Sequence, residues 1–154
     1  MTQQKKKEEI SYQLESIDQI KEGLVKYRNA VIGEKYEHLP YHLTPTKETI
    51  LRTIYEKQSC IVSDITKVLG LSPGAITIVL NQLEDEELVK RIYKKMNRRS
   101  VWVELTEKGK KVVRTMQETR IDFWSNILSH LTEEERAQYI HIMTKLSKKI
   151  NESK

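Results

Sequence analysis

The sequence of 154 residues has one cysteine, three prolines, five glycines and one phenylalanine. A single cysteine, Cys60, excludes an intramolecular disulfide and a site of several thiolates, which fits a reducing compartment. Few glycines and prolines disfavour a fold of many short turns and favour helices. No apolar run reaches the roughly 18 residues of a membrane span, and the N-terminus lacks the apolar core of a signal peptide. We therefore expect a cytoplasmic protein of one folding unit, or of a small unit with arms, without a membrane partner.

The net charge of +5 is distributed unevenly along the chain. Residues 88–114 carry 10 basic and 2 acidic side chains, residues 44–87 have a net charge of −3, and the two ends are neutral. A basic excess confined to one short stretch favours contact with phosphate groups.

Apolar spacing and capping residues predict a mainly α (α+β) fold. Spacings of three, four and seven predict a long helix over residues 8–32, whose apolar face needs cover from a partner helix. Thr44 and Pro45 predict the start of a second helix. Gly70 closing one short helix and Ser72 capping the next predict a helix-turn-helix. Its buried side is expected to comprise Ile65, Val68, Leu69, Leu71, Ile76, Val79, Leu80 and Leu83.

The chain changes character at residue 88. Alternating β-branched and aromatic residues predict strands over 88–93 and 100–105, and a short strand near Cys60 is expected beside this hairpin. Four of the six residues between the strands are cations: Lys94-Lys95-Met96-Asn97-Arg98-Arg99. Thr106 and Thr132 are then expected to cap two further helices.

This order of elements, with five short motifs, resembles the MarR family of bacterial transcriptional regulators over nearly the whole chain. The motifs are Leu43-Thr44-Pro45, Leu69-Gly70-Leu71-Ser72-Pro73, Leu83-Glu84 with Leu88-Val89, Asn97-Arg98-Arg99 and Leu105-Thr106-Glu107-Lys108-Gly109. The resemblance implies a winged helix-turn-helix at residues 39–106, flanked by dimerisation helices at 1–38 and 107–154. It also implies a homodimer that places a recognition helix in the major groove and a wing in or near the minor groove.

Residues 72–85 are the predicted recognition helix, with its N-terminal part against base edges. Asn81 and Gln82 can each make two hydrogen bonds to adenine, and Ala75, Thr77 and Ile78 can meet a thymine methyl group. An exposed Ile78 is either such a contact or a residue placed in the wrong register. The predicted DNA-binding residues are Ser72, Gly74, Ala75, Thr77, Ile78, Asn81, Gln82, Lys90, Arg91, Lys94, Lys95, Asn97, Arg98 and Arg99.

The chain departs from the family in charge. Family members often carry a basic residue where this chain has Ile78 or Gln82, and acidic residues where its wing has Lys94 and Asn97. A neutral helix face beside a cationic wing predicts a preference for A·T-rich sites. The helix also ends in Glu84-Asp85-Glu86-Glu87, where the family usually has glycine, and we interpret this acidic quartet as a solvated edge facing away from DNA.

The resemblance further implies a pocket for a small aromatic or anionic effector between the dimerisation helices and the winged domain. Tyr27, Tyr36, Tyr41 and Arg120 are candidates to line it. The alternative role for the three tyrosines is packing in the structural core.

Redox and metal chemistry have weaker support in the sequence. Some family members sense oxidants through a cysteine in the first helix, where this chain has none, so Cys60 is interpreted as an ordinary buried thiol. The histidines do not have the spacing of a ligand cluster, so no metal or cofactor is expected, and the alternative is a zinc site across a dimer interface. They are His38, His42, His130 and His141.

The sequence lacks a glycine-rich phosphate loop and a motif that sets a nucleophile beside a base, so we expect no enzyme. The predicted function is a homodimeric repressor of transcription that binds a pseudo-palindromic site on double-stranded DNA and is relieved by a small ligand. Two alternatives stay open, a winged-helix module that binds a ligand or a protein without a DNA role, and a small enzyme.

Overall fold

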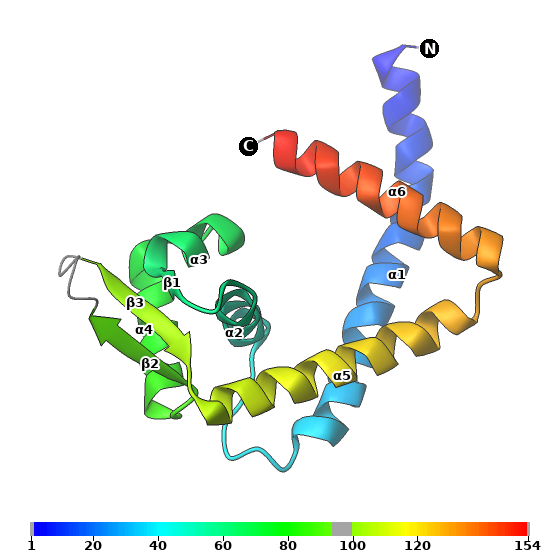
Figure 1. The fold of residues 1–154 in the computed structure, drawn as a ribbon. Coiled ribbons are helices and arrows are strands. Elements are labelled where there is room, and N and C mark those ends of the chain that lie inside the picture. The colour runs from blue at the N-terminus through cyan, green and yellow to red at the C-terminus, as the bar shows by residue number, and fades with distance from the viewer. Residues whose placement is uncertain (1, 94–99, 154) are drawn as a thin grey trace. The chain divides into compact units, whose positions relative to one another are not determined.

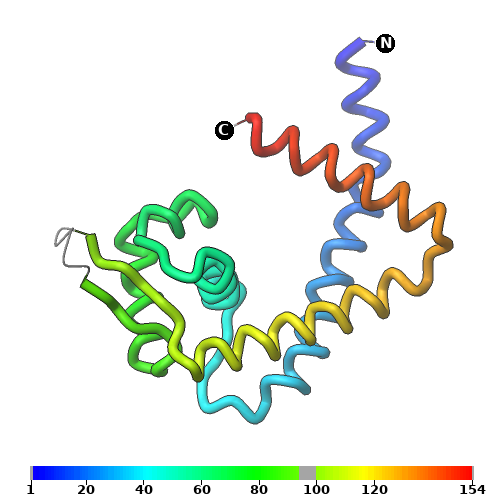
Figure 2. The backbone as a smooth tube through the Cα atoms, viewed as in Figure 1, coloured from blue at the N-terminus to red at the C-terminus, as the bar shows by residue number. Residues whose placement is uncertain are grey.

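The computed structural model describes residues 2–93 and 100–153, and the chain divides into two compact units, Met1–Met116 and Gln117–Lys154. Helix α5 runs across the division. The elements are α1 (Gln3–Tyr36), α2 (Pro45–Lys57), β1 (Cys60–Ile61), α3 (Val62–Leu69), α4 (Pro73–Asp85), β2 (Val89–Tyr93), β3 (Val101–Leu105), α5 (Glu107–Ser129) and α6 (Glu133–Glu152). Figure 1 labels them, and Figure 2 traces the backbone through them. The predicted mainly helical α+β fold is confirmed, and α1 is longer at both ends than predicted.

Local hydrogen bonds set the ends of the helices around the helix-turn-helix. Thr44 Oγ1 accepts from the backbone N–H of Lys47 at 3.2 Å, and Ser72 Oγ accepts from the backbone N–H of Ala75 at 3.2 Å. A proline follows each of these caps, at a position where a helix needs no N–H donor. Gly70 ends α3 in the left-handed conformation, with φ at 66°. The predicted caps and turn are therefore confirmed.

The three strands form one antiparallel sheet in the order β1-β3-β2. Val89 lies opposite Leu105 at one end of the hairpin, and Cys60 on the two-residue strand β1 lies opposite Val103 on β3. Figure 1 shows α3 and α4 gathered beside these strands. Both the hairpin and the short third strand agree with the sequence prediction.

The core of the first unit joins α2, α3 and α4 to the sheet. Its fully buried side chains include Ile50, Ile54, Ile65, Ile76, Leu80, Leu83, Leu88, Val103 and Val113. The prediction of a buried position is wrong for two residues, because Val68 is 52% exposed and Leu71 is 41% exposed. Helix α3 has only two turns and buries Ile65, and Leu71 follows the left-handed residue that redirects the chain away from the helix axis.

The first and last helices, α1 and α6, leave apolar side chains accessible to solvent. None of the described residues in α1 or in α6 is buried. The exposed apolar residues of these two helices are Ile10, Tyr12, Leu14, Ile17, Ile20, Val25, Ile140, Ile142, Met143, Leu146 and Ile150. Within the described chain no single helix is long and apolar enough to cross a membrane, although α3 and α4, bent by 111°, pass that test as a pair.

Candidate nucleic-acid interface

Helix α4 presents the predicted recognition face to solvent. Gly74, Thr77, Asn81 and Gln82 are exposed, and Ala75 is half-buried. Ile78 is 62% exposed, while Ile76, Leu80 and Leu83 are buried, so a shifted register is excluded. The predicted contacts of these residues with DNA remain predictions.

Two hydroxyl groups at the start of this face already make hydrogen bonds within α4. Ser72 Oγ accepts its capping hydrogen bond, and Thr77 Oγ1 donates to the carbonyl oxygen of Pro73 at 2.8 Å. Because the hydroxyl proton of Thr77 is used within the helix, its methyl group and oxygen lone pairs are what it can offer to a base. This arrangement suits the predicted contact with a thymine methyl group.

The wing is the hairpin of β2 and β3. Its two described cations on β2, Lys90 and Arg91, have different surroundings. Lys90 has a side chain that is 56% exposed and lies 3.9 Å from Glu104 on the neighbouring strand. Arg91, only 24% exposed, pairs with Glu84 and donates to Asn81 Oδ1 at 2.6 Å. The other predicted wing residues lie outside the described residues, and these are Lys94, Lys95, Asn97, Arg98 and Arg99.

The acidic quartet that ends α4 is exposed at Asp85 and Glu87, as a solvated edge would be, but it also links α4 to other elements. Three of its four carboxylates pair with cations from three elements. Glu84 pairs with Arg91 of β2, Glu86 Oε1 lies 2.5 Å from Lys47 Nζ of α2, and Glu87 Oε2 lies 3.4 Å from Lys108 Nζ of α5.

The family motif at residues 105–109 ties the start of α5 to this same end of α4. Thr106 donates its backbone N–H to the Leu88 carbonyl at 3.1 Å and its hydroxyl to the Glu87 carbonyl at 2.6 Å. Lys108 Nζ donates to the Glu86 carbonyl at 2.9 Å. A Cβ on Gly109 would overlap the carbonyl oxygen of Leu88, so this approach requires glycine. The sequence contained these residues but no signal that identified their partners.

Cys60 is a fully buried side chain on β1. Burial raises its thiol pKa to about 11, and the negative charge of Asp64 adds to the rise, while Lys57 opposes it. Thiol reactivity requires the thiolate, which this environment disfavours at neutral pH. The interpretation of an ordinary buried thiol is therefore supported.

The candidate effector residues fall in both units. Tyr36 and Tyr41 pack against the core of the first unit, which supports the alternative that these tyrosines are structural. Burial and the nearby Glu86 carboxylate raise the pKa of Tyr41, and Lys108 Nζ lies 5.5 Å from the centre of its ring. Tyr27 is half-buried on α1, whereas Arg120 is exposed in the second unit. An effector pocket among these residues stays a prediction.

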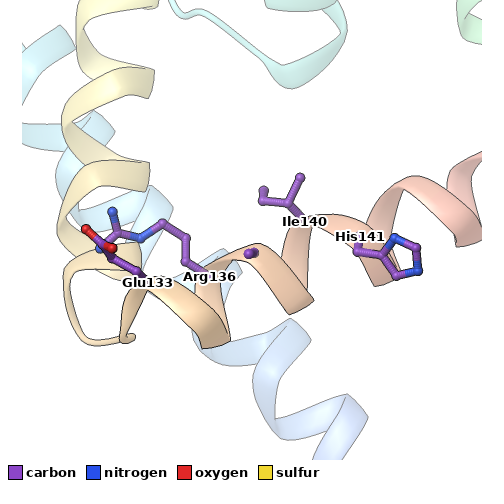
Figure 3. A pocket seen from close by; sticks show the side chains of 5 residues that line it. Glu133, Arg136, Ile140 and His141 are labelled. Carbon is purple, nitrogen blue, oxygen red and sulfur yellow. The ribbon is translucent and has the colours of Figure 1, made fainter.

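An open hollow of about 520 Å³ lies along one face of α6, lined by Glu133, Arg136, Ala137, Ile140 and His141. Figure 3 shows side chains of this face projecting from a single helix. None of the predicted effector residues lines it. Among the described residues, no group of three or more His, Cys, Asp or Glu side chains could hold a metal ion.

Known proteins resemble this chain in sequence and in fold. The model of the MarR family matches residues 43–101, from two residues before α2 to the first residue of β3. The chain is 34% identical to the uncharacterized HTH-type transcriptional regulator YwhA of Bacillus subtilis, over 81% of this chain and 90% of YwhA. It is 30% identical to the HTH-type transcriptional repressor MdtR of the same organism, over 68% of each chain.

Solved structures agree in fold. A mutant MarR from E. coli complexed with operator DNA has a TM-score of 0.68 at 21% identity, covering 85% of this chain and 93% of that one. Bordetella bronchiseptica BpsR, whose DNA binding is regulated by 6-hydroxynicotinic acid, has a TM-score of 0.65 at 18% identity, covering 86% and 98%. At these identities the likeness establishes the fold alone.

Proposed function

The chain belongs to the MarR family of transcriptional regulators, and from that premise we propose that it is a homodimeric repressor relieved by a small-molecule ligand. The observation that carries the proposal is the solvent-exposed face of α4, a helix that Ser72 caps and that packs against β2, where Lys90 is an exposed cation. A helix N-terminus and nearby cations attract phosphates, and the exposed helix face reads base edges. Its relatives are regulators, and we assign this chain no catalytic activity.

Homodimer formation is proposed from the accessible apolar side chains of α1 and α6. A second copy is the occupant that the family resemblance implies for these faces. Two recognition helices related by a two-fold axis would then contact half-sites about one helical turn, roughly 34 Å, apart on a pseudo-palindromic operator.

The proposal that this chain represses transcription, and that a ligand relieves the repression, is based on two related proteins. MdtR is named a repressor, and DNA binding by BpsR is regulated by an aromatic acid. We propose that a small aromatic or anionic effector acts on this chain in the same way, with Tyr27, Tyr36, Tyr41 and Arg120 as the candidate contacts.

A preference for A·T-rich operators follows from the described helix face. Its exposed side chains are uncharged, so it lacks the arginine or lysine that most often reads guanine. Selection of bound sequences from a random duplex pool should return an A·T-rich consensus. A G·C-rich consensus would contradict this preference while leaving DNA binding intact.

The test of the function is duplex binding as a function of salt. DNA from beside the protein's own gene is titrated with the intact chain and with the Arg98→Ala plus Arg99→Ala variant. Because each lost phosphate contact reduces the slope of log affinity against log salt by about 0.9, the variant should bind at least about tenfold more weakly, with a slope shallower by about two.

The matched control is Lys5→Ala plus Lys6→Ala, which removes the same net charge from an exposed stretch outside the winged helix-turn-helix. It should bind like the intact chain. Equal retardation of all three proteins would contradict the role of the wing. Duplex binding without salt dependence would favour the alternative of a winged-helix module that binds a ligand or a protein.

A further inference from the structure

Arg91 connects the wing to the recognition helix through two side chains of α4. Its Nη1 pairs with Glu84 Oε2, and its Nη2 donates to Asn81 Oδ1 at 2.6 Å. Asn81 and Glu84 stand three positions apart on α4, so they are neighbours on one helix face. Arg91 is 24% exposed and Glu84 39% exposed at their side chains, so this bridge is partly shielded from solvent.

The bridge determines how the carboxamide of Asn81 is turned. A guanidinium has five N–H donors and no acceptor. With the amide reversed, Asn81 Nδ2 would face Arg91 Nη2, and two donors would oppose each other. The oxygen therefore faces Arg91, and Nδ2 is left to donate in another direction. Glu84 holds the guanidinium in place, because a planar fork with two fixed partners has little freedom to rotate.

We propose that Arg91 is a positioning residue that fixes the amide of Asn81 and thereby sets which base Asn81 reads. The inference rests on the proposed function and assigns Arg91 a role other than the phosphate contact predicted from the sequence. A fixed Nδ2 donor requires an acceptor on the base, which purine N7, guanine O6 and thymine O4 supply. Cytosine offers an N4 donor in the major groove and is rejected at this position.

The two roles of Arg91 predict different results for Arg91→Lys. A lysine keeps the positive charge, so a phosphate contact would survive with its salt dependence. A lysine ammonium is a point charge on a flexible stem and lacks the planar fork that bridges Glu84 and Asn81. As a positioning residue, Arg91 is therefore not replaced by lysine, and the amide of Asn81 becomes able to turn and accept from cytosine N4.

Glu84→Ala provides a second, independent variant. Removing a carboxylate makes the winged domain more positive, which on electrostatic grounds alone strengthens binding to all duplexes alike. If Glu84 holds Arg91 in place, the same substitution also loosens the amide of Asn81 and weakens discrimination against cytosine. Lys90→Ala serves as the reference for loss of an exposed wing cation.

The experiment begins with selection of a consensus from a random duplex pool by the intact chain and by Asn81→Ala. The position at which the two consensus sequences differ is the one that Asn81 reads. Affinities are then measured for the consensus duplex and for the same duplex with cytosine at that position, at several salt concentrations. Thermal melting of each variant accompanies the binding measurements.

The intact chain should reject cytosine by roughly tenfold or more, the discrimination expected of a good side-chain contact with a base. Arg91→Lys and Glu84→Ala should reduce that ratio to about twofold or less, with the salt slope of Arg91→Lys unchanged. Lys90→Ala should keep the ratio and lose affinity for both duplexes.

Two results would overturn the inference and leave the function standing: full discrimination by Arg91→Lys, or an Asn81→Ala consensus identical to that of the intact chain. Absence of salt-dependent duplex binding by the intact chain would overturn both the function and the inference.

Discussion

At the scale of single residues, two glycines in the first turns of helices differ in the space that a Cβ atom would have. Gly109 in α5 approaches the carbonyl oxygen of Leu88 so closely that a Cβ would overlap it, whereas Gly74 in α4 has no neighbour within 4 Å of a Cβ. Only the first position therefore needs glycine for steric reasons.

Gly109→Ala should lower the free energy of unfolding by about 2 kcal/mol or more, because the start of α5 must move away from Leu88. Gly74→Ala should be neutral or stabilising by up to about 1 kcal/mol, because alanine is the better helix former. Denaturant unfolding of both variants measures these changes. Equal stability of the two would show that α5 does not approach Leu88 as described.

Because the Cys60 thiol is buried, the free energy of unfolding depends on pH in the alkaline range. The buried thiol keeps its proton up to a pKa of about 11, whereas a thiol in the unfolded chain loses it near pH 9. Between these values the folded state binds more protons, so the free energy of unfolding falls as pH rises, by at most about 1.4 kcal/mol per pH unit. The contribution is complete below pH 9 and is lost as pH rises through 11.

The measurement compares the intact chain with Cys60→Ala, which lacks the ionisable group but titrates otherwise alike. The difference in their free energies of unfolding should be constant up to about pH 9 and then shrink. A constant difference up to pH 11 would mean that the thiol ionises at the same pH in both states.

At the scale of elements, the pair between Lys47 and Glu86 connects the start of α2 to the end of α4. Lys47 Nζ lies 2.5 Å from Glu86 Oε1, and the two side chains are only 7% and 20% exposed. A pair this shielded differs from Arg52 and Glu56 on α2, which lie 4.0 Å apart with side chains 36% and 67% exposed. Exposed pairs contribute little, whereas loss of one partner from a shielded pair leaves a desolvated charge.

Lys47→Ala should therefore cost about 2 kcal/mol of unfolding free energy, because a charge-assisted hydrogen bond is lost and the Glu86 carboxylate stays shielded. Glu56→Ala, on the same helix, should cost less than about 0.5 kcal/mol. Chemical denaturation of the two variants gives the comparison. Similar costs for both substitutions would contradict a stabilising role for the shielded pair.

At the scale of the whole molecule, the accessible apolar side chains of α1 are the basis of the proposed dimer. Ile17 is 52% exposed on the apolar face of α1, and Gln19 lies on the opposite face of the same helix. Ile17→Glu should place a charge in a subunit interface and shift the protein toward monomer, whereas Gln19→Glu adds the same charge without that effect.

Sedimentation over a range of concentrations measures this shift. The Ile17→Glu variant should also lose affinity for a two-site operator, since one half-site per monomer replaces two held together. Dimers of unchanged stability in both variants would exclude this face of α1 from the interface.

Local signals in the sequence were sufficient for the order of the elements. A hydroxyl side chain caps a helix through a residue three positions ahead, and an apolar face repeats within one or two turns, so Thr44, Ser72 and Gly70 could be interpreted without the fold. The exposed position of Ile78 followed from the same periodicity. The prediction failed at Val68 and Leu71, because periodicity marks an apolar face without showing whether another element covers it.

The sequence by itself therefore determined the helix-turn-helix, the hairpin and the concentration of basic residues at 88–114, since each depends on neighbours in the chain. Only the tertiary structure decided the partners of the acidic quartet. Glu86 and Lys47 are 39 positions apart, and Arg91 reaches Asn81 only because β2 packs beside α4. Residues at such separations are brought together by packing of the core, and side-chain type alone does not specify which cation meets which carboxylate.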